Sequence, residues 1–445
     1  MTFSALDSPL TGPLFTTPAM RALFSARAEI AAMIEVEAAL ARVEAAHGLV
    51  PEALADAIAA IDPDALDLDA IGEATREAGV PSIPVLAAMR GLLPDGLADH
   101  LHRGATTQDL IDTALALRAK RAFALLEAEC DAVIAALVAL ARAHARTPCV
   151  GRTYGQHATP ITFGHVVALW AAGIAEAAAD LASAARGACR LSLGGPAGTL
   201  PGLGGLGPAI ADDLARRLGL APAPIAWHVR RGAIARAGCA LAILTGALAK
   251  MAGDVVLLGA SETAEVAEPH APGRGGSSAM PHKRNPVSST AILANASAAR
   301  GCVIPLLDAI VAAHQRPAGA WHAEWHALPP LFGLAAGALA HARTIAEGLV
   351  VDVARMRANL EAGGGLVFAE AAASALAPHL GAAEAKARVT AAADRARAER
   401  IGLRAALEAS GDGVPLDAAF DLAPHIDASA AFVARALADL ETGRG

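Results

Sequence analysis

The chain has 445 residues, a formal net charge of −8, 54% hydrophobic residues and only 3% aromatic residues. Its length allows two or three domains around a large buried core. Because strands draw on aromatic and β-branched residues, this composition favours close-packed helices over β-sheet. The negative charge excludes an overall basic field for nucleic acid or an anionic membrane, so an anionic ligand must be held by a local cluster of positive groups.

Cysteine usage and the N-terminal segment favour a cytoplasmic protein. The five cysteines are scattered and never form a CxxC pair, which fits a reducing compartment better than a disulfide framework or a zinc ribbon. No basic stretch followed by an apolar core opens the chain, as it would in a signal peptide. The longest strongly apolar run, 237–249, falls short of the roughly 20 residues that a membrane span needs. This run predicts a helix that lies inside a bundle and is buried on all sides.

The first hundred or so residues alternate short helical stretches with Pro, Gly and Asp breaks, and residues 27–47 show clear helical periodicity. Residues 107–146 contain neither Pro nor Gly, which allows a helix of about 40 residues. Further long helices are expected at 160–190, 230–265, 286–314 with a kink at Pro305, and 327–350.

Helices of this length must bury their apolar faces against one another, which indicates an elongated bundle. The last part of the chain returns to shorter helices around glycine-rich turns. We therefore predict an all-α fold with an N-terminal helical domain at 1–110, a central long-helix bundle at 111–355 and a small C-terminal helical domain at 356–445.

Polar chemistry is concentrated in three loops, each of which precedes a long helix. They are HRGATTQD at 102–109, GRTYGQHATP at 151–160 and GRGGSSAMPHKRNPVSS at 273–289. Thr106 and Asp109 have capping-box spacing, and the Thr-Pro and Asn-Pro pairs of the other two loops fit an N-cap followed by proline. The free N–H groups of helix N-termini favour anions. Helix capping alone would explain one such loop, but three together favour a functional site.

Sequential bundle helices joined by short loops run antiparallel, so the first two loops should lie at opposite ends of the bundle. One subunit cannot easily bring both to one site. We therefore predict a homo-oligomer whose active sites are shared between subunits, with a dihedral tetramer as the expected form.

Two other patterns carry less weight. The glycine-rich stretch at 192–208 lacks both a preceding strand and a GKS or GKT end, which argues against a nucleotide loop. His322 and His326 have a helical metal-ligand spacing, but the HExxH order and a third ligand are missing. A core or substrate-lining role is expected for Trp321 and Glu324 instead.

The segment GSSAMPHKRNP at 276–286 resembles the signature loop of the fumarase/aspartase superfamily, and the other two loops resemble its other conserved regions in the same order. The resemblance covers nearly the whole chain. It implies three helical domains whose central bundles form the 20-helix core of a tetramer, with each active site built by three subunits. It also implies a reaction that needs neither a cofactor nor a metal.

The superfamily chemistry removes a proton next to a carboxylate and passes through an aci-carboxylate dianion. Such a reaction needs a base and strong stabilisation of developing negative charge. The resemblance assigns the base to Ser277, with the run of glycines before it as a hinge, and we add His157 as a second catalytic candidate. The expected substrate-binding residues are His102, Thr106, Thr107, Gln108, Thr153, Tyr154, Gln156, Ser278, Met280, Lys283 and Asn285.

The second loop separates the branches of the superfamily, because Tyr154 stands where the fumarases and the C–N lyases carry a histidine used in acid catalysis. Expelling an amine needs a general acid, whereas a carboxylate leaves as a stable anion at neutral pH. Tyr154 therefore favours the muconate cycloisomerase branch, whose substrate is a small tricarboxylate. An adenylosuccinate lyase-like C–N lyase and a non-catalytic structural relative remain as alternatives. Arg103 stands in place of the usual aromatic residue, so either it binds an extra carboxylate or the substrate differs.

Overall fold

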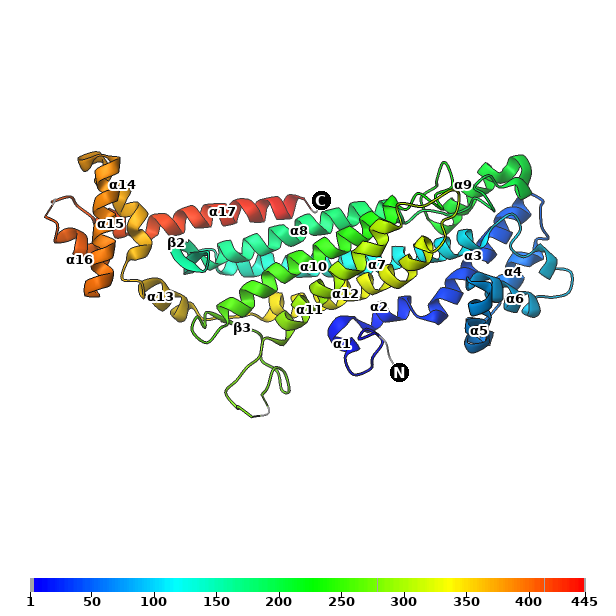
Figure 1. Ribbon diagram of the computed structural model, residues 1–445, viewed down its shortest axis with the longest axis horizontal. Helices are drawn as coiled ribbons and strands as arrows, with labels where there is room; N and C mark the ends of the chain where they lie inside the picture. Colours follow the sequence, from blue (N-terminus) through cyan, green and yellow to red (C-terminus); the bar gives the residue numbers. More distant parts are fainter. Residues whose placement is uncertain (1–3, 278, 412, 444–445) are drawn as a thin grey trace. The chain divides into compact units, whose positions relative to one another are not determined.

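The computed structural model describes residues 4–277, 279–411 and 413–443 and is predominantly helical (Figure 1). The all-α fold class is therefore confirmed. Contacts within the chain divide it into two compact units. Unit 1 comprises Met1–Cys130, Glu176–Leu248 and Ala291–Ala340, and unit 2 comprises Asp131–Ala175, Ala249–Thr290 and His341–Gly445. Each long helix contributes to both units, so the three-domain boundaries drawn from the sequence stay a prediction.

Short elements of unit 1 pack around the helix α3, whose buried face is mostly apolar but also includes Glu37 and Glu44. Ser25 caps α3 by accepting a hydrogen bond from the amide of Ala28, and Ile30, Met33 and Leu40 lie in the core at the predicted helical spacing. Helix α3 spans Ala26–Ala46, and the short elements of this unit are α1 (Gly12–Phe15), α2 (Pro18–Leu23), α4 (Ala53–Ala59), η1 (Pro63–Ala65), α5 (Leu68–Ala78), α6 (Ser82–Leu92), η2 (Ala98–His100), η3 (Pro201–Leu206) and α9 (Gly207–Leu218).

The predicted long helices are all present. They are α7 (Thr107–Ala143), α8 (Phe163–Ala188), α10 (Gly232–Leu258), α11 (Val287–Asp308) and α12 (Ala320–Gly348). Pro305 lies inside α11, as expected from the sequence, and α12 begins before the predicted start at residue 327 and continues through Pro329 and Pro330.

The predicted start of α8 is wrong. Thr159 and Pro160 belong to a strand rather than to a helix N-terminus, because the chain forms a hairpin here. Thr162 takes the capping role instead, since its Oγ1 accepts a hydrogen bond of 3.2 Å from the amide of His165.

Unit 2 contains two short antiparallel sheets and a cluster of short helices. Strands β1 (Pro148–Thr153) and β2 (Gln156–Thr162) form one sheet, and β3 (Val266–Ala267) pairs with β4 (Val350–Val351) in the other. Helices α14 to α16 pack together around a small apolar core that includes Leu376, Val389 and Leu403 (Figure 1). The elements after β4 are α13 (Val353–Glu361), η4 (Leu366–Phe368), α14 (Ala369–Leu380), α15 (Ala382–Glu399), α16 (Leu403–Glu408), η5 (Asp417–Phe420) and α17 (Ala423–Thr442).

Three helices, α8, α10 and α11, are long and apolar enough to cross a membrane by length and composition, with between 33% and 39% of their most apolar windows buried within the chain. The prediction that residues 237–249 are buried on all sides is therefore wrong for the single chain, because Ile243 in that stretch is 52% exposed. Leu257 and Ile304 are exposed as well. Apolar helix faces of this size require a cover, since folded soluble chains rarely expose large contiguous apolar patches.

Candidate functional site

The loop before α7 turns sharply and packs tightly. His102 and Gly104 both adopt a left-handed backbone, with φ values of 65° and 70°. A Cβ atom on Gly104 would lie 2.5 Å from Cγ of Leu203, so this close approach requires glycine. The amide of Thr106 donates a hydrogen bond of 3.0 Å to Oδ2 of Asp109. This bond is one half of a capping box, as the spacing of the two residues predicted.

The carboxylate of Asp109 fastens the glycine-rich loop to the start of α7. Its Oδ1 accepts hydrogen bonds from Nε2 of His228 at 2.6 Å, from the amide of Gly194 at 2.9 Å and from the hydroxyl of Ser192 at 3.4 Å. Its Oδ2 accepts one from the amide of Gly195 at 2.8 Å. Asp109 is buried, so these donors supply the hydrogen bonds that water cannot. The glycine-rich loop therefore frames the first polar loop.

A second buried network lies one turn along α7. The guanidinium of Arg231 donates hydrogen bonds to Asp112 at 2.7 Å and to Glu324 at 2.8 Å, and Nε1 of Trp321 donates to Asp112 at 3.0 Å. The guanidinium also lies 4.8 Å from the ring centroid of Trp227, within cation–π range. Trp321 and Glu324 are therefore buried in the core, which is one of the two roles expected from the sequence.

Electrostatics keeps Arg231 charged although its side chain is completely buried. Burial lowers its pKa, but attraction to Asp112 and hydrogen bonds to both carboxylates outweigh that effect and raise it. Burial has the opposite effect on an acid, so it raises the pKa of Glu324, although the hydrogen bond and charge of Arg231 act to lower it. Losing one member of such a network leaves an uncompensated buried charge, which typically costs about 3–5 kcal/mol.

The His322 and Glu324 side chains, which share the HxExH pattern with His326, contact protein groups. Nε2 of His322 lies 3.2 Å from the carbonyl of Gly79, while Glu324 binds Arg231. Within the described residues, no group of three or more His, Cys, Asp or Glu side chains is placed to hold a metal ion.

Gln108 and Arg316 meet at the start of α7. Gln108 is fully buried, and its Nε2 donates a hydrogen bond of 2.9 Å to the carbonyl of His228. Its Oε1 accepts a hydrogen bond of 3.2 Å from Arg316, whose guanidinium also donates to Thr106 and to the carbonyl of Pro196, both at 3.4 Å. Sequence reasoning missed Arg316, a single arginine in the loop between α11 and α12. Its only signal in the sequence was its position just before the segment that contains Trp321 and Glu324.

Arg103 is exposed, and its Nη1 donates a hydrogen bond of 3.1 Å to the backbone carbonyl of Leu49. Its other donors stay open to a ligand, so its role as an extra carboxylate-binding group stays a prediction. His102 has a different partner, since its Nδ1 lies 2.6 Å from a carboxylate oxygen of Glu37.

In unit 2, the second polar loop forms the tip of the β1–β2 hairpin. Thr153 pairs with Gln156, and between them Tyr154 and Gly155 have φ values of 50° and 74°. Two successive positive φ values are those of a type I′ turn, the favoured turn of a two-residue hairpin. The side chains of the tip, including His157, are exposed, and Tyr154 is 104% exposed. No part of the chain that the structure describes covers these candidate residues.

A bidentate ion pair holds this hairpin to the segment that leads into the signature loop. The guanidinium of Arg152 contacts the carboxylate of Glu265 at 2.9 Å and 2.5 Å, and Nδ2 of Asn359 donates to the same carboxylate at 2.8 Å. Paired hydrogen bonds of this kind fix orientation as well as distance.

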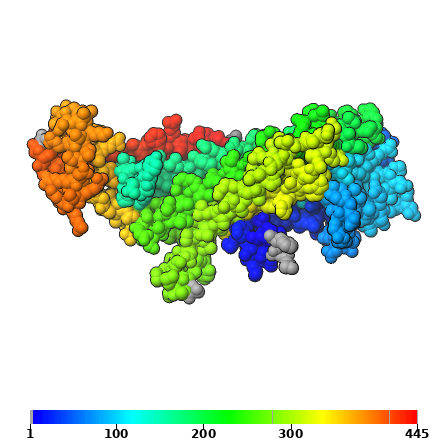
Figure 2. Space-filling view, in the orientation of Figure 1, coloured from blue at the N-terminus to red at the C-terminus, as the bar shows by residue number. Residues whose placement is uncertain are grey.

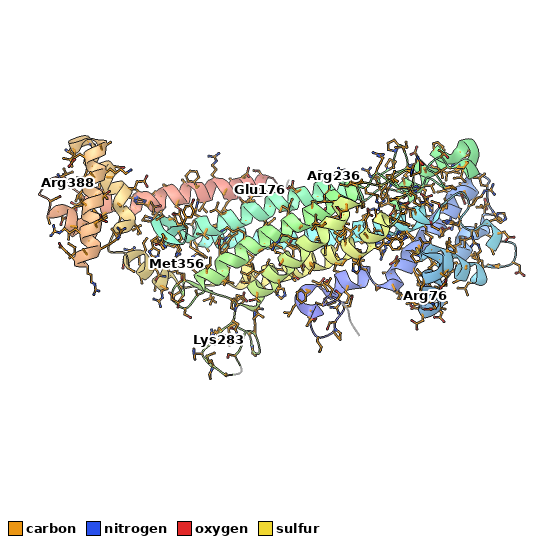
Figure 3. All side chains as sticks on the ribbon, in the orientation of Figure 1. Arg76, Glu176, Arg236, Lys283, Met356 and Arg388 are labelled. Carbon is orange, nitrogen blue, oxygen red and sulfur yellow. The ribbon has the colours of Figure 1, made fainter. Side chains whose placement is uncertain are left out.

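The signature loop projects away from the helices of its own unit, and Lys283 is labelled on it in Figure 3. Oγ of Ser277 accepts hydrogen bonds from the amides of Met280 at 3.1 Å and of Ala279 at 3.4 Å. Lys283 is exposed and pairs with no acidic side chain in the part of the chain that is described. The candidate residue Ser278 lies outside the described residues.

The prediction that Asn285 caps α11 is wrong, because the carboxylate of Glu268 binds the free amides of the first turn instead. Its carboxylate accepts hydrogen bonds from the amides of Ser288 at 3.0 Å and Ser289 at 2.7 Å. The amide of Asn285 donates a hydrogen bond of 2.9 Å to the carbonyl of Gly275, and this bond closes the base of the loop. Figure 2 shows the loop standing out from the surface of unit 2.

The structure therefore places the candidates in three groups, one in unit 1 and two in unit 2. In unit 1, Thr106, Thr107 and Gln108 share the start of α7, and His102 ends the turn before it. In unit 2, one group is the hairpin tip and the other is the signature loop. A groove of about 1040 Å³ between α3, α4 and α9 contains none of the candidate residues.

Comparison with known proteins gives a consistent result. The sequence profile of a lyase family matches residues 14–301. The chain is 41% identical to the 3-carboxy-cis,cis-muconate cycloisomerase of Bradyrhizobium diazoefficiens, covering 98% of each chain, and 42% identical to the nitrosuccinate lyase of Streptomyces davaonensis, covering 92% of this chain and 88% of that one. The crystal structure of the 3-carboxy-cis,cis-muconate lactonizing enzyme of Pseudomonas putida superposes with a TM-score of 0.93 at 38% identity, covering 98% of this chain and all of that one. The chain therefore belongs to this lyase family and has the fold of the fumarase/aspartase superfamily.

Proposed function

We propose that this enzyme is a 3-carboxy-cis,cis-muconate cycloisomerase that forms 4-carboxymuconolactone in the cytoplasmic breakdown of protocatechuate. The observation that carries the proposal is Tyr154 at the hairpin tip, in a chain that matches a named cycloisomerase over 98% of both sequences. The C–N lyases of the superfamily carry a histidine there. Lactone opening, the reverse of the proposed reaction, expels a carboxylate. A carboxylate is a stable anion at neutral pH, so this reaction does not need the histidine as an acid.

In the forward reaction, one carboxylate oxygen of the substrate attacks an alkene carbon of the same molecule and forms the C–O bond of the lactone. The π electrons move into the adjacent carboxylate, which becomes an aci-carboxylate, and a proton is then delivered to the carbon beside it. Atoms and charge balance without an external reductant or oxidant. The protein must hold three carboxylates, stabilise the dianion and move one proton.

We assign the proton to Ser277. The two backbone amides that donate to its Oγ would stabilise the alkoxide form, because hydrogen bonds to a charged form favour that form. Lys283 lies on the same loop and has no acidic partner in the described chain, so its charge is available to the dianion. Closure of the loop over substrate would bring the two groups together.

We assign one substrate carboxylate to Arg316. In the described chain its hydrogen-bond acceptors are the neutral oxygens of Gln108, Thr106 and Pro196, and no carboxylate there pairs with its positive charge. A guanidinium matches the planar geometry of a carboxylate. Thr107 and the other free amides at the start of α7 would add the dipole of the helix N-terminus.

We further propose a homotetramer with shared active sites. The exposed apolar faces of α8, α10 and α11 are the surfaces that partner subunits would cover, which removes any need for a membrane. The uncovered hairpin tip fits a site that is completed by another subunit. Mixing inactive Ser277→Ala chains with inactive Arg316→Ala chains before refolding or during co-expression should restore activity if subunits share sites, because some sites then receive two intact loops.

A lyase acting on nitrosuccinate is the second candidate, because a nitrosuccinate lyase is 42% identical to this chain. Eliminating nitrite would also expel a weakly basic anion, so Tyr154 does not separate this reaction from lactonisation.

The direct test follows the ultraviolet absorbance of 3-carboxy-cis,cis-muconate with the purified enzyme, with nitrosuccinate and adenylosuccinate in parallel. Loss of the diene absorbance supports the proposal, and turnover of nitrosuccinate alone would replace it. Ser277→Ala should abolish turnover while light scattering shows an unchanged oligomer. Activity of the Ser277→Ala variant would show that another residue carries the proton.

A further inference from the structure

The imidazole of His102 is held from one side only. Its Nδ1 lies 2.6 Å from Oε1 of Glu37, and the two side chains are 12% and 2% exposed. Within the described chain, no other hydrogen bond engages the ring. Nε2 is therefore the nitrogen that a bound molecule can reach.

The backbone at His102 is strained to reach this position. Its φ of 65° is left-handed, a conformation that residues other than glycine seldom adopt. Such strain persists only where the surroundings determine the conformation, and it concentrates at functional sites. The contact with Glu37, 65 residues away along the chain, is the visible constraint on the side chain.

The carboxylate of Glu37 also fixes where the protons of the ring lie. An ionised carboxylate only accepts hydrogen bonds, so Nδ1 carries a proton and Nε2 becomes the second donor when the ring is charged. Burial lowers the pKa of His102, but the charge and hydrogen bond of Glu37, with a contribution from Asp109, outweigh burial and the opposing Arg90, and the pKa is raised.

A second buried carboxyl group, Glu44, lies two helical turns further along α3. It is 1% exposed, and its Oε1 has no hydrogen-bond partner in the described chain. Burial, followed by repulsion from Glu37, raises the pKa of Glu44 to about 8, although Arg103 acts in the opposite direction. Glu44 is therefore mainly protonated at neutral pH, and Glu37 is the carboxylate that balances the charge of His102.

We propose that Glu37 is a positioning residue that holds His102 as an imidazolium and presents its Nε2–H to a carboxylate of the substrate. The identity of the ligand as a polycarboxylate rests on the proposed function. The orientation and charge of the ring rest on the pair itself. Glu37 acts through His102 and does not touch the substrate.

The activity test compares Glu37→Gln with the matched control Glu44→Gln on the same helix. The glutamine at position 37 can still accept from Nδ1 but carries no charge, so orientation survives and the imidazolium is lost near neutral pH. We expect kcat/KM of Glu37→Gln to fall about tenfold or more at pH 8, chiefly through KM, and much less at pH 6, because a histidine with an ordinary pKa of about 6.5 is then largely protonated. Glu44→Gln should keep the wild-type profile at and below neutral pH. A wild-type profile for Glu37→Gln would overturn the proposal.

A second measurement needs no substrate and no variant. Diethyl pyrocarbonate reacts with neutral imidazole, so the pH dependence of His102 modification, read by mass spectrometry, reports the protonation of the ring. The midpoint for wild-type enzyme should lie above the ordinary value of about 6.5. A midpoint at or below that value would overturn the proposal even if Glu37→Gln fails to fold. Failure of the muconate assay with a raised midpoint would reject the proposed substrate and leave the pair intact.

Discussion

Asp109 offers the sharpest test of how the site is assembled. Replacing it by asparagine keeps the size and shape of the side chain but exchanges one acceptor oxygen for an NH₂ group. If the remaining oxygen accepts from His228 and Gly194, the new NH₂ group faces the amides of Gly195 and Thr106, which lie 2.8 Å and 3.0 Å from the present carboxylate oxygen. Two donors would then point at a third donor.

The cost follows from these contacts. Hydrogen bonds to a charged group contribute about 1.5–3 kcal/mol each, and two are lost together with the charge that pairs with His228. We expect the local opening free energy of the glycine-rich loop to fall by about 3–5 kcal/mol. At about 1.4 kcal/mol per factor of ten, amide hydrogen exchange in this loop should quicken about a hundredfold or more.

Hydrogen exchange read by mass spectrometry measures this effect peptide by peptide. Ser192→Ala is the matched control, because it removes only the 3.4 Å bond of the serine hydroxyl to the same carboxylate and should change exchange little. Exchange of Gly194 and Gly195 that stays within a few-fold of wild type in Asp109→Asn would refute the argument that this carboxylate holds the loop.

Three further predictions concern packing and buried ionisable groups. Gly104→Ala should lower the melting temperature more than Gly96→Ala does. Both glycines have a positive φ, but only an alanine at 104 would clash with Leu203. Equal decreases in melting temperature would exclude the clash. The pKa of Glu44, raised from 4.5 to about 8, means that the folded state binds this proton more tightly, so its contribution to stability is complete below about pH 4.5 and is lost as the pH rises towards 8. Glu44→Gln should therefore gain stability over wild type from pH 5 to pH 8, by up to about 3 kcal/mol, and a constant difference would contradict the shift. Burial raises the pKa of Cys149 to about 12, so this thiol should react slowly with a thiol reagent at pH 8 in the native enzyme and fast in denaturant. Rapid labelling of the native enzyme would show that the region around Cys149 opens to solvent.

The long helices could be predicted from local sequence because their signals are local. The run without Pro or Gly after Thr107 predicted α7, and the Thr106–Asp109 spacing predicted the contact at its start. The β1–β2 hairpin could not be predicted from the same signals. Its turn uses Tyr154-Gly155 rather than the usual Asn-Gly or Asp-Gly pair, and Thr159-Pro160 imitates a helix N-terminus.

The partners of the site residues could not be predicted because they are distant in sequence. Asp109 meets His228 across 119 positions, and Gln108 meets Arg316 across 208. Nothing local to Glu37 distinguishes it from the exposed glutamate at position 35 except helical phase. Motifs identify the residues that carry chemistry, but the groups that orient and charge them come from the tertiary fold.

The charges around the start of α7 in unit 1 point to the kind of ligand that the site takes. Asp109 is paired with His228, and Glu37 is paired with His102. Arg231 is paired with two carboxylates. Arg316 is different, because the acceptors that it meets in the described chain are neutral. A cation held in place by neutral oxygens remains free to bind an anion, and a fixed imidazolium beside the same loop would provide a second positive donor. A substrate with several carboxylates is the ligand that such an arrangement favours.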